Sequence, residues 1–280
     1  MTRVFISIDM EGIAGIAHLN QVWRGNDDFP AARVLMTKEA NAAVAGAFDA
    51  GATAVIVNDS HGDMYNVLPE ELDPRAELLI GGPKVWSMMQ GFGADFDIAL
   101  FIGYHAAAGT EGAVLDHTYA GRLLYEVRLN GEAVTEAELN AALAGTFGVP
   151  VGLVTGDDKC CAQVAARLKG IRTVVVKQGF GRGVAQSLHP SAARKAIREA
   201  AAEVVESVPE FHPYVLDGPY VLEADTANTS SADLCALAPG CERTGPRTVR
   251  FETADFRQAF RCLLAWTYLG ASEAPRYAGT

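Results

Sequence analysis

The feature that most constrains the fold is an alternation of short apolar runs with alanine-rich stretches of helical period. Residues 4–8 and 53–57 are typical of buried strands, and residues 32–50 carry apolar side chains at helical spacing up to Gly51. Strand–helix–strand units place parallel strands in one sheet, so the pattern predicts an α/β fold with a mostly parallel sheet flanked by helices. Further strands are expected at residues 77–80, 97–103, 149–155 and 173–177, and further helices at residues 84–90, 136–147, 158–168 and 191–205.

A β-hairpin is expected to be inserted in this series. Asn130-Gly131 separates two strand-like runs, residues 123–129 and 132–134, and this dipeptide tolerates the positive φ angles of a type I′ turn. The glycine-rich residues 179–183 are interpreted as a flexible connector between two parts of the chain. We therefore predict an α/β domain over residues 1–180 and a smaller C-terminal α+β domain over residues 181–280.

Charge and composition exclude several classes of function. The chain has 23 basic and 34 acidic side chains and a net charge of −11, and it lacks the clustered basic surface that nucleic-acid binding requires. No apolar run approaches the ~20 residues of a membrane span, and the first residues do not have the layout of a signal peptide. Five cysteines without a C-x-x-C motif favour reduced thiols in the cytoplasm. We expect a cytoplasmic protein with neither nucleic-acid nor membrane partners.

Polar side chains follow three of the predicted strands directly. Asp9 and Glu11 come after the first strand, His61 ends the segment Asn58-Asp59-Ser60-His61 after the second, and His105 follows the strand at residues 97–103. Ligands of parallel sheets bind at the carboxyl ends of the strands, and carboxylates and imidazoles are ligands for zinc and other divalent transition metals. Each residue alone is better explained by a turn, a cap or a structural hydrogen bond. The agreement of three strand ends favours a metal site.

Other polar residues permit more than one interpretation. His117 lies in the polar segment Leu115-Asp116-His117-Thr118, where a surface imidazole and a catalytic one are both consistent with the sequence. Asp158 is expected to cap the helix that follows it. Cys160 and Cys161 then fall in the first helical turn, where we expect small buried side chains in preference to reactive thiols.

Several separate blocks, in order along nearly the whole chain, resemble one known family, the zinc-dependent D-aminopeptidases of the self-compartmentalising DppA type. The blocks are Ser7-Ile8-Asp9-Met10-Glu11-Gly12, Asn58-Asp59-Ser60-His61, Gly103-Tyr104-His105-Ala106, Gly156-Asp157-Asp158, Lys177-Gln178, and Arg243-Thr244-Gly245 to Val249-Arg250-Phe251.

The resemblance implies a metallo-aminopeptidase that hydrolyses the N-terminal residue, a D-amino acid such as D-Ala, from short peptides or amides. It implies two zinc ions per subunit, bridged by one carboxylate. It also implies a catalytic histidine that acts as nucleophile or base. The implied assembly is a homodecamer built from rings. Glu138 is the alternative to Glu136 as the glutamate that the resemblance implies. The implied bridging ligand is Asp9, the other metal ligands are Glu11, His61, His105 and Glu136, and the catalytic residue is His117.

Two other classes of function remain open at this stage. A two-metal phosphoesterase uses the same kinds of ligand, although no basic or glycine-rich phosphate cradle accompanies these strand ends. A non-catalytic metal-dependent binding module would keep the ligands and lack turnover. An assay with a simple amide substrate separates the binding module from an enzyme.

Overall fold

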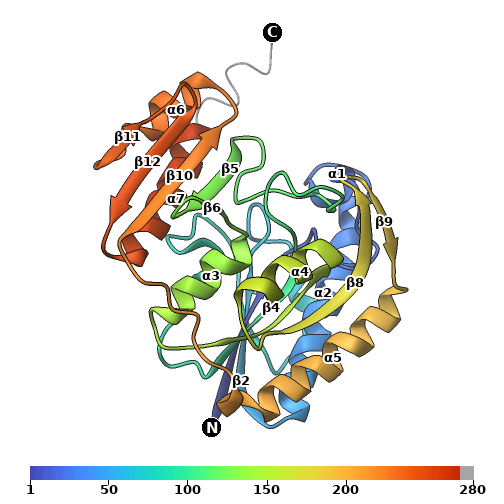
Figure 1. Ribbon diagram of the computed structural model, residues 1–280. Helices are drawn as coiled ribbons and strands as arrows, with labels where there is room; N and C mark the ends of the chain where they lie inside the picture. Colours follow the sequence, from blue (N-terminus) through green and yellow to red (C-terminus); the bar gives the residue numbers. More distant parts are fainter. Residues whose placement is uncertain (272–280) are drawn as a thin grey trace.

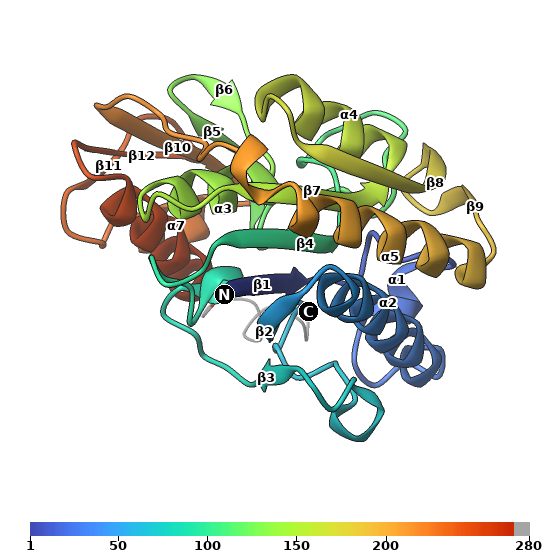
Figure 2. The same ribbon diagram turned by 90° about the horizontal axis from the view of Figure 1, so that it is seen from below.

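A seven-stranded sheet forms the centre of the larger part of the molecule (Figures 1 and 2). It is seen in a computed structural model that describes residues 1–271. The strands are parallel except for the last, which is antiparallel to its neighbour. Their order is β3 (Glu77–Leu79), β2 (Ala52–Asp59), β1 (Thr2–Ile8), β4 (Ile98–Tyr104), β7 (Val151–Asp157), β8 (Arg172–Gly181) and β9 (Val184–Ser187).

Two long helices, α2 (Phe29–Asp49) and α5 (Pro190–Glu206), lie side by side on one face of this sheet (Figure 2). Alternate residues of a strand point to opposite faces, so Val4 packs in the cluster under these helices and Phe5 in the cluster on the other face. The two helices approach closely at Gly46, where an added Cβ would lie 2.2 Å from a backbone oxygen of α5. Glycine is therefore required at this crossing.

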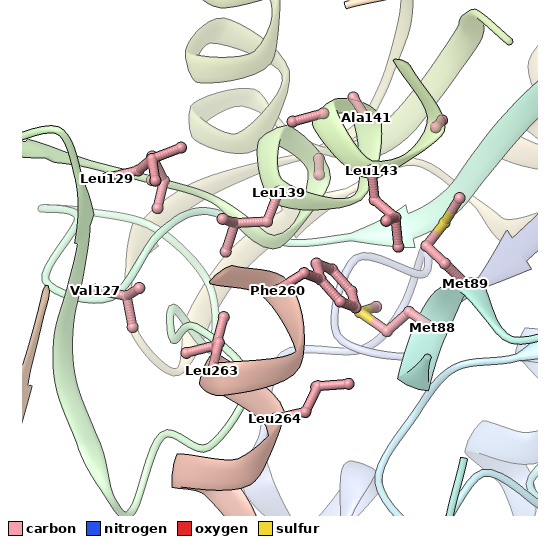
Figure 3. Packing of buried hydrophobic residues seen from close by; sticks show 14 of the residues in the cluster. Met88, Met89, Val127, Leu129, Leu139, Ala141, Leu143, Phe260, Leu263 and Leu264 are labelled. Atoms are coloured by element: carbon pink, nitrogen blue, oxygen red, sulfur yellow. The ribbon is translucent and has the colours of Figure 1, made fainter. Parts of the chain in front are cut away.

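The other face is covered by α3 (Glu136–Gly145), α4 (Asp158–Arg167) and a second, antiparallel sheet. This five-stranded sheet is covered by α6 (Thr229–Cys235) and α7 (Phe256–Ala271). Figure 3 shows Phe260 and Leu263 of α7 beside Leu139 and Leu143 of α3, in the core between the two sheets. The strand order is β11 (Cys241–Arg243), β12 (Thr248–Thr253), β10 (Tyr220–Thr226), β5 (Leu124–Leu129) and β6 (Glu132–Ala133).

The predicted α/β class and the predicted hairpin are confirmed. Asn130 and Gly131 have φ angles of 53° and 84°, as a type I′ turn requires. The hairpin β5–β6 belongs to the second sheet, where β5 pairs with β10. This sheet thus combines segments from before and after residue 180, and the division into domains at that point stays a prediction.

Three local predictions are wrong. Residues 84–90 form only the short 3₁₀ turn η2 (Ser87–Met89) and no α-helix, since Ser87 has a φ of 48°. The glycines at 179–183 belong to the hairpin of β8 and β9, not to a connector. Asp157, not Asp158, caps α4 by accepting a hydrogen bond from the Cys160 amide at 2.7 Å. The remaining short helices are α1 (Leu19–Val22), η1 (Pro69–Glu71) and η3 (Val208–Glu210).

The helices and the cysteines of residues 1–271 bear on two further predictions, one about membrane spans and one about thiols. Over residues 1–271, none of the helices combines the length and the apolarity needed to cross a bilayer. Cys160 and Cys161 are buried, and burial raises the pKa of the Cys161 thiol to about 12. They are small buried side chains, as expected.

Candidate active site

The predicted metal ligands meet at the carboxyl ends of three adjacent strands. Asp9 and Glu11 follow β1, His61 follows β2, and His105 follows β4. Glu136 is the first residue of α3, whose N-terminus points to the same place. Parallel pairing aligns the three strand ends, and this alignment brings residues far apart in the sequence into one buried cluster.

Asp9 lies between two separate imidazoles. Its Oδ1 is 3.2 Å from Nδ1 of His61, and its Oδ2 is 3.4 Å from Nε2 of His105. A second carboxylate faces each ring: Glu11 Oε2 is 3.0 Å from His61 Nδ1, and Glu136 Oε1 is 3.4 Å from His105 Nε2. The cluster therefore consists of two carboxylate–imidazole groups that share Asp9.

Backbone carbonyls orient the two rings. Nε2 of His61 donates to the carbonyl of Val22 at 2.7 Å, and Nδ1 of His105 donates to the carbonyl of Ala106 at 3.0 Å. A hydrogen bond of this kind fixes which ring nitrogen remains for a metal. The nitrogens that remain are the two that face the carboxylates.

The carboxylates and imidazoles stabilise each other's charges. Burial acts to raise the pKa of Asp9, but its contacts with His105 and His61 and the positive charge of the two rings outweigh it and hold the pKa well below its ordinary range. Burial acts to lower the pKa of both histidines, yet the facing carboxylates raise each histidine pKa well above its usual value. The same carboxylates that stabilise the protonated rings also attract a divalent cation.

The cluster has the properties of a metal centre. Nε2 of His105 is buried and has no hydrogen-bond partner among the described residues, and a buried polar atom without a partner is costly. In two sets of three residues, the ligand atoms lie within 4.8 Å of one another: Asp9, Glu11 and His105, and His105, His117 and Glu136. Such mixed oxygen and nitrogen donors fit zinc.

His117 lies at the edge of this cluster, on the loop after β4. Its ring stacks on His105 with centroids 3.9 Å apart, and its Nε2 is 3.7 Å from Oε1 of Glu136. Its Nδ1 donates to the carbonyl of Leu115 at 2.9 Å. The side chain is 19% exposed, whereas that of His105 is 1% exposed. His117 is thus the more accessible of the two stacked imidazoles.

A cavity of about 1280 Å³ opens over the cluster. Asp9, Glu11, His61 and Glu136 line it, and His117 lines it as well. Three arginines also line the cavity, namely Arg24, Arg122 and Arg182. The cavity is large enough for a short peptide.

Not every polar residue at the strand ends faces the cluster. Asp59 instead accepts hydrogen bonds from the amides of Asn66 and Val67, and so stabilises the loop after β2. Glu138 forms a capping box with Thr135, accepting from its amide at 2.7 Å. Of the two glutamates considered, Glu136 is the one that faces the cluster.

Two residues that hold the site in place, Lys177 and Asp157, were named from the sequence only within the family blocks and were given no role. Lys177 is buried, and its Nζ donates to the carbonyls of Ile13 and Ile16 at 2.9 Å and 2.6 Å, in the loop that carries Glu11. Burial lowers the pKa of Lys177 to about 8. Asp157 accepts from the amide of Val114 at 2.7 Å, near the start of the loop that carries His117. Each of the two follows an apolar, strand-like run in the sequence, and this position is the signal that could have indicated a role at the site.

Comparison with known proteins identifies the family of this chain. The sequence model of the Peptidase_M55 family, described as D-aminopeptidase, matches residues 2–265. A D-aminopeptidase of Bacillus subtilis (strain 168) is 36% identical over 271 residues, which cover 95% of this chain and 97% of the relative. The solved structure of the Zn-dependent D-aminopeptidase DppA from Bacillus subtilis, described as a self-compartmentalizing protease, superposes with a TM-score of 0.92 at 35% identity and covers 96% of this chain and 98% of that one.

The fold and the family match define an enzyme of the aminopeptidase class. The chain belongs to the Peptidase_M55 family of D-aminopeptidases. The predicted family, fold class and enzyme class are therefore confirmed.

Proposed function

We propose that this protein is a two-zinc D-aminopeptidase that removes the N-terminal residue, a D-amino acid such as D-alanine, from short peptides or amides. The observation that carries the proposal is the position of Asp9, whose two oxygens face two different histidines. One carboxylate between two donor groups suits a pair of bound ions that share a bridging ligand.

The proposed ligand set follows the two groups. Asp9 would be shared by the two ions, Glu11 and His61 would hold one of them, and His105 and Glu136 would hold the other. The short distances within each group support this assignment, as does the buried Nε2 of His105, which faces two carboxylates but makes no hydrogen bond among the described residues. When bound, the zinc ions supply the positive charge that holds the substrate's amine and polarises the carbonyl to be cleaved.

His117 is the proposed catalytic residue. Because its Nδ1–H donates to the carbonyl of Leu115, the lone pair of the neutral ring is on Nε2, beside Glu136. That lone pair can attack the scissile carbonyl or take a proton from the attacking water, so the same geometry serves a nucleophile or a base. In either role the ring becomes positively charged, and the Glu136 carboxylate stabilises that charge.

Membership of the D-aminopeptidase family favours a peptidase over the two-metal phosphoesterase considered from the sequence. A binding module without turnover would not need an accessible imidazole beside the cluster, and His117 argues against it.

Assembly and location are proposed on the same basis. The structural relative is described as a self-compartmentalizing protease, and we propose that this chain also forms a closed homo-oligomer, a decamer, in the cytoplasm. A closed assembly restricts access to the cavities inside it, so short peptides would be the substrates.

Zinc content and hydrolysis, measured on one preparation, test the proposed function. We expect about two zinc ions per chain, as in two-metal hydrolases, and faster hydrolysis of D-aminoacyl than of L-aminoacyl chromogenic amides. Full metal without hydrolysis of any amide would instead support the binding module. Phosphoester hydrolysis without amide hydrolysis would support the phosphoesterase.

A further inference from the structure

The three arginines of the cavity differ in whether a carboxylate neutralises them. Arg24 is 3.5 Å from Asp63, and Arg182 is paired with Asp116 at 2.5 Å. Arg122 has no ion-pair or hydrogen-bond partner over residues 1–271. In a chain with a net charge of −11, an unneutralised guanidinium in a cavity is a specific attraction for an anion.

Arg122 is held in place by an aromatic ring. Its guanidinium carbon lies 3.8 Å from the centroid of the Trp23 ring, and Trp23 also lines the cavity. A guanidinium stacked by its face keeps its edge N–H groups free, and these match a carboxylate in bidentate geometry. Trp23 thus orients the group without occupying its donors.

The backbone beside Arg122 touches the proposed catalytic residue. A Cβ added to Gly121 would lie 2.7 Å from Cβ of His117. Arg122 follows directly, so its Cα is about 3.8 Å from that of Gly121. In an extended dipeptide the carbonyl carbon of the peptide bond to be cleaved and the carbon of the terminal carboxylate are one residue apart, about 3.5 Å, so a group that binds this carboxylate must lie close to the catalytic residue.

We propose that Arg122, stacked on Trp23, binds the free C-terminal carboxylate of the substrate and so makes the enzyme a dipeptidase in preference. This inference rests on the proposed function, and it adds the substrate class: short peptides with a free carboxylate, above all dipeptides, in place of amides or blocked peptides. Arg122 binds at the end of the substrate remote from the cluster, and its contribution is specificity.

The test compares two substrates that differ only in the anion, D-alanyl-D-alanine and D-alanyl-D-alanine amide. The wild-type enzyme should prefer the dipeptide by kcat/KM. Arg122→Gln should reduce that preference by about 10-fold to 100-fold, the range for losing a hydrogen bond to a charged group. Arg122→Lys, which keeps the charge but not the fork, should give an intermediate value.

Arg24→Gln is the matched control. Arg24 lines the same cavity and is likewise 3.8 Å from an aromatic centroid, that of Tyr65, but Asp63 neutralises it. Its replacement should leave the preference close to that of the wild type. Equal loss of both activities in Arg122→Gln, or an unchanged preference, would overturn the inference.

Binding measurements separate this inference from the proposed function. If the wild-type enzyme hydrolyses neither peptide, the proposed function fails, and calorimetric titration of the same two peptides then decides the role of Arg122. Tighter binding of the dipeptide that Arg122→Gln abolishes supports a carboxylate site. Equal affinity of the wild-type protein for both peptides overturns it.

Discussion

The imidazole rings of His105 and His117 stack in parallel, with centroids 3.9 Å apart and an angle of 12° between their planes. Glu136 faces Nε2 of both rings, at 3.4 Å and 3.7 Å. One ring is buried and the other borders the cavity, so the pair joins the proposed metal position to the space where a substrate binds.

Replacing Asp9 by Ala should empty both zinc positions. Among the described residues, Asp9 lies within ion-pair distance of both histidines, so its loss removes a ligand from each proposed ion. Elemental analysis should find much less than one zinc ion per chain. Asp63→Asn, changed at an exposed side chain beside the cavity, is the control. Full metal in the Asp9 variant would contradict the bridging role.

Replacing His117 by Ala should lower turnover by ~10²-fold or more while the metal stays bound, because a positioned proton-transfer group contributes at least that much. Zinc content and hydrolysis of a D-alanyl amide are measured on the same sample, with His189→Ala, altered outside the cluster, as the control. Metal loss would make His117 a ligand, a role that its distance to Glu136 also permits. Near-normal turnover would return it to a surface imidazole.

The part of the site that sequence predicts is the part that strand geometry controls. Asp9, Glu11, His61 and His105 each follow an apolar run, and parallel pairing brings such positions together whatever lies between them. Glu136 begins a helix instead, and it reaches the cluster because α3 packs against β4. Only the family resemblance pointed to it.

The antiparallel sheet was less predictable for a similar reason. The hairpin at Asn130-Gly131 is a local signal, but its partner strand β10 pairs Ala224 with Val127 across nearly a hundred residues. No pattern within either strand specifies this pairing. The loop that carries His117 likewise depends on a distant contact, that of Asp157 with the Val114 amide.

Glu39 should make the protein less stable as the pH rises. Its side chain is buried against the Ala14 amide, and its Oε2 has no partner among the described residues. Burial raises its pKa from 4.5 to about 7. Between these values the folded protein keeps a proton that the unfolded chain has lost, so the free energy of unfolding falls with rising pH and levels off above pH 7, by roughly 3 kcal/mol in total.

Glu39→Gln removes this titration. The stability of the variant relative to the wild type should therefore increase between about pH 5 and about pH 8, as measured by denaturant unfolding of the chelator-treated proteins. The histidines of the cluster titrate in both proteins and cancel in the difference. Glu199→Gln, changed at a side chain that is 61% exposed on α5, is the control. A difference that does not vary with pH would contradict the assignment to Glu39.

The hairpin of β8 and β9 has the properties of a subunit contact. β9 is the edge strand of the seven-stranded sheet, and an edge strand offers unpaired backbone groups to a second chain. Phe180, Val184 and Leu188 on this hairpin are exposed, at 64%, 59% and 44%. Apolar side chains grouped at an edge favour burial against another subunit.

Replacing Val184 by Glu should therefore reduce the size of the assembly. Light scattering on the wild-type protein should give a mass near that of ten subunits, and the variant should give a smaller species because a buried, unpaired carboxylate opposes association. Val215→Glu is the matched control, since Val215 is 68% exposed but lies outside this hairpin. An unchanged mass in the Val184 variant would exclude the hairpin as a contact, and a monomeric wild-type protein at micromolar concentration would contradict the proposed decamer itself.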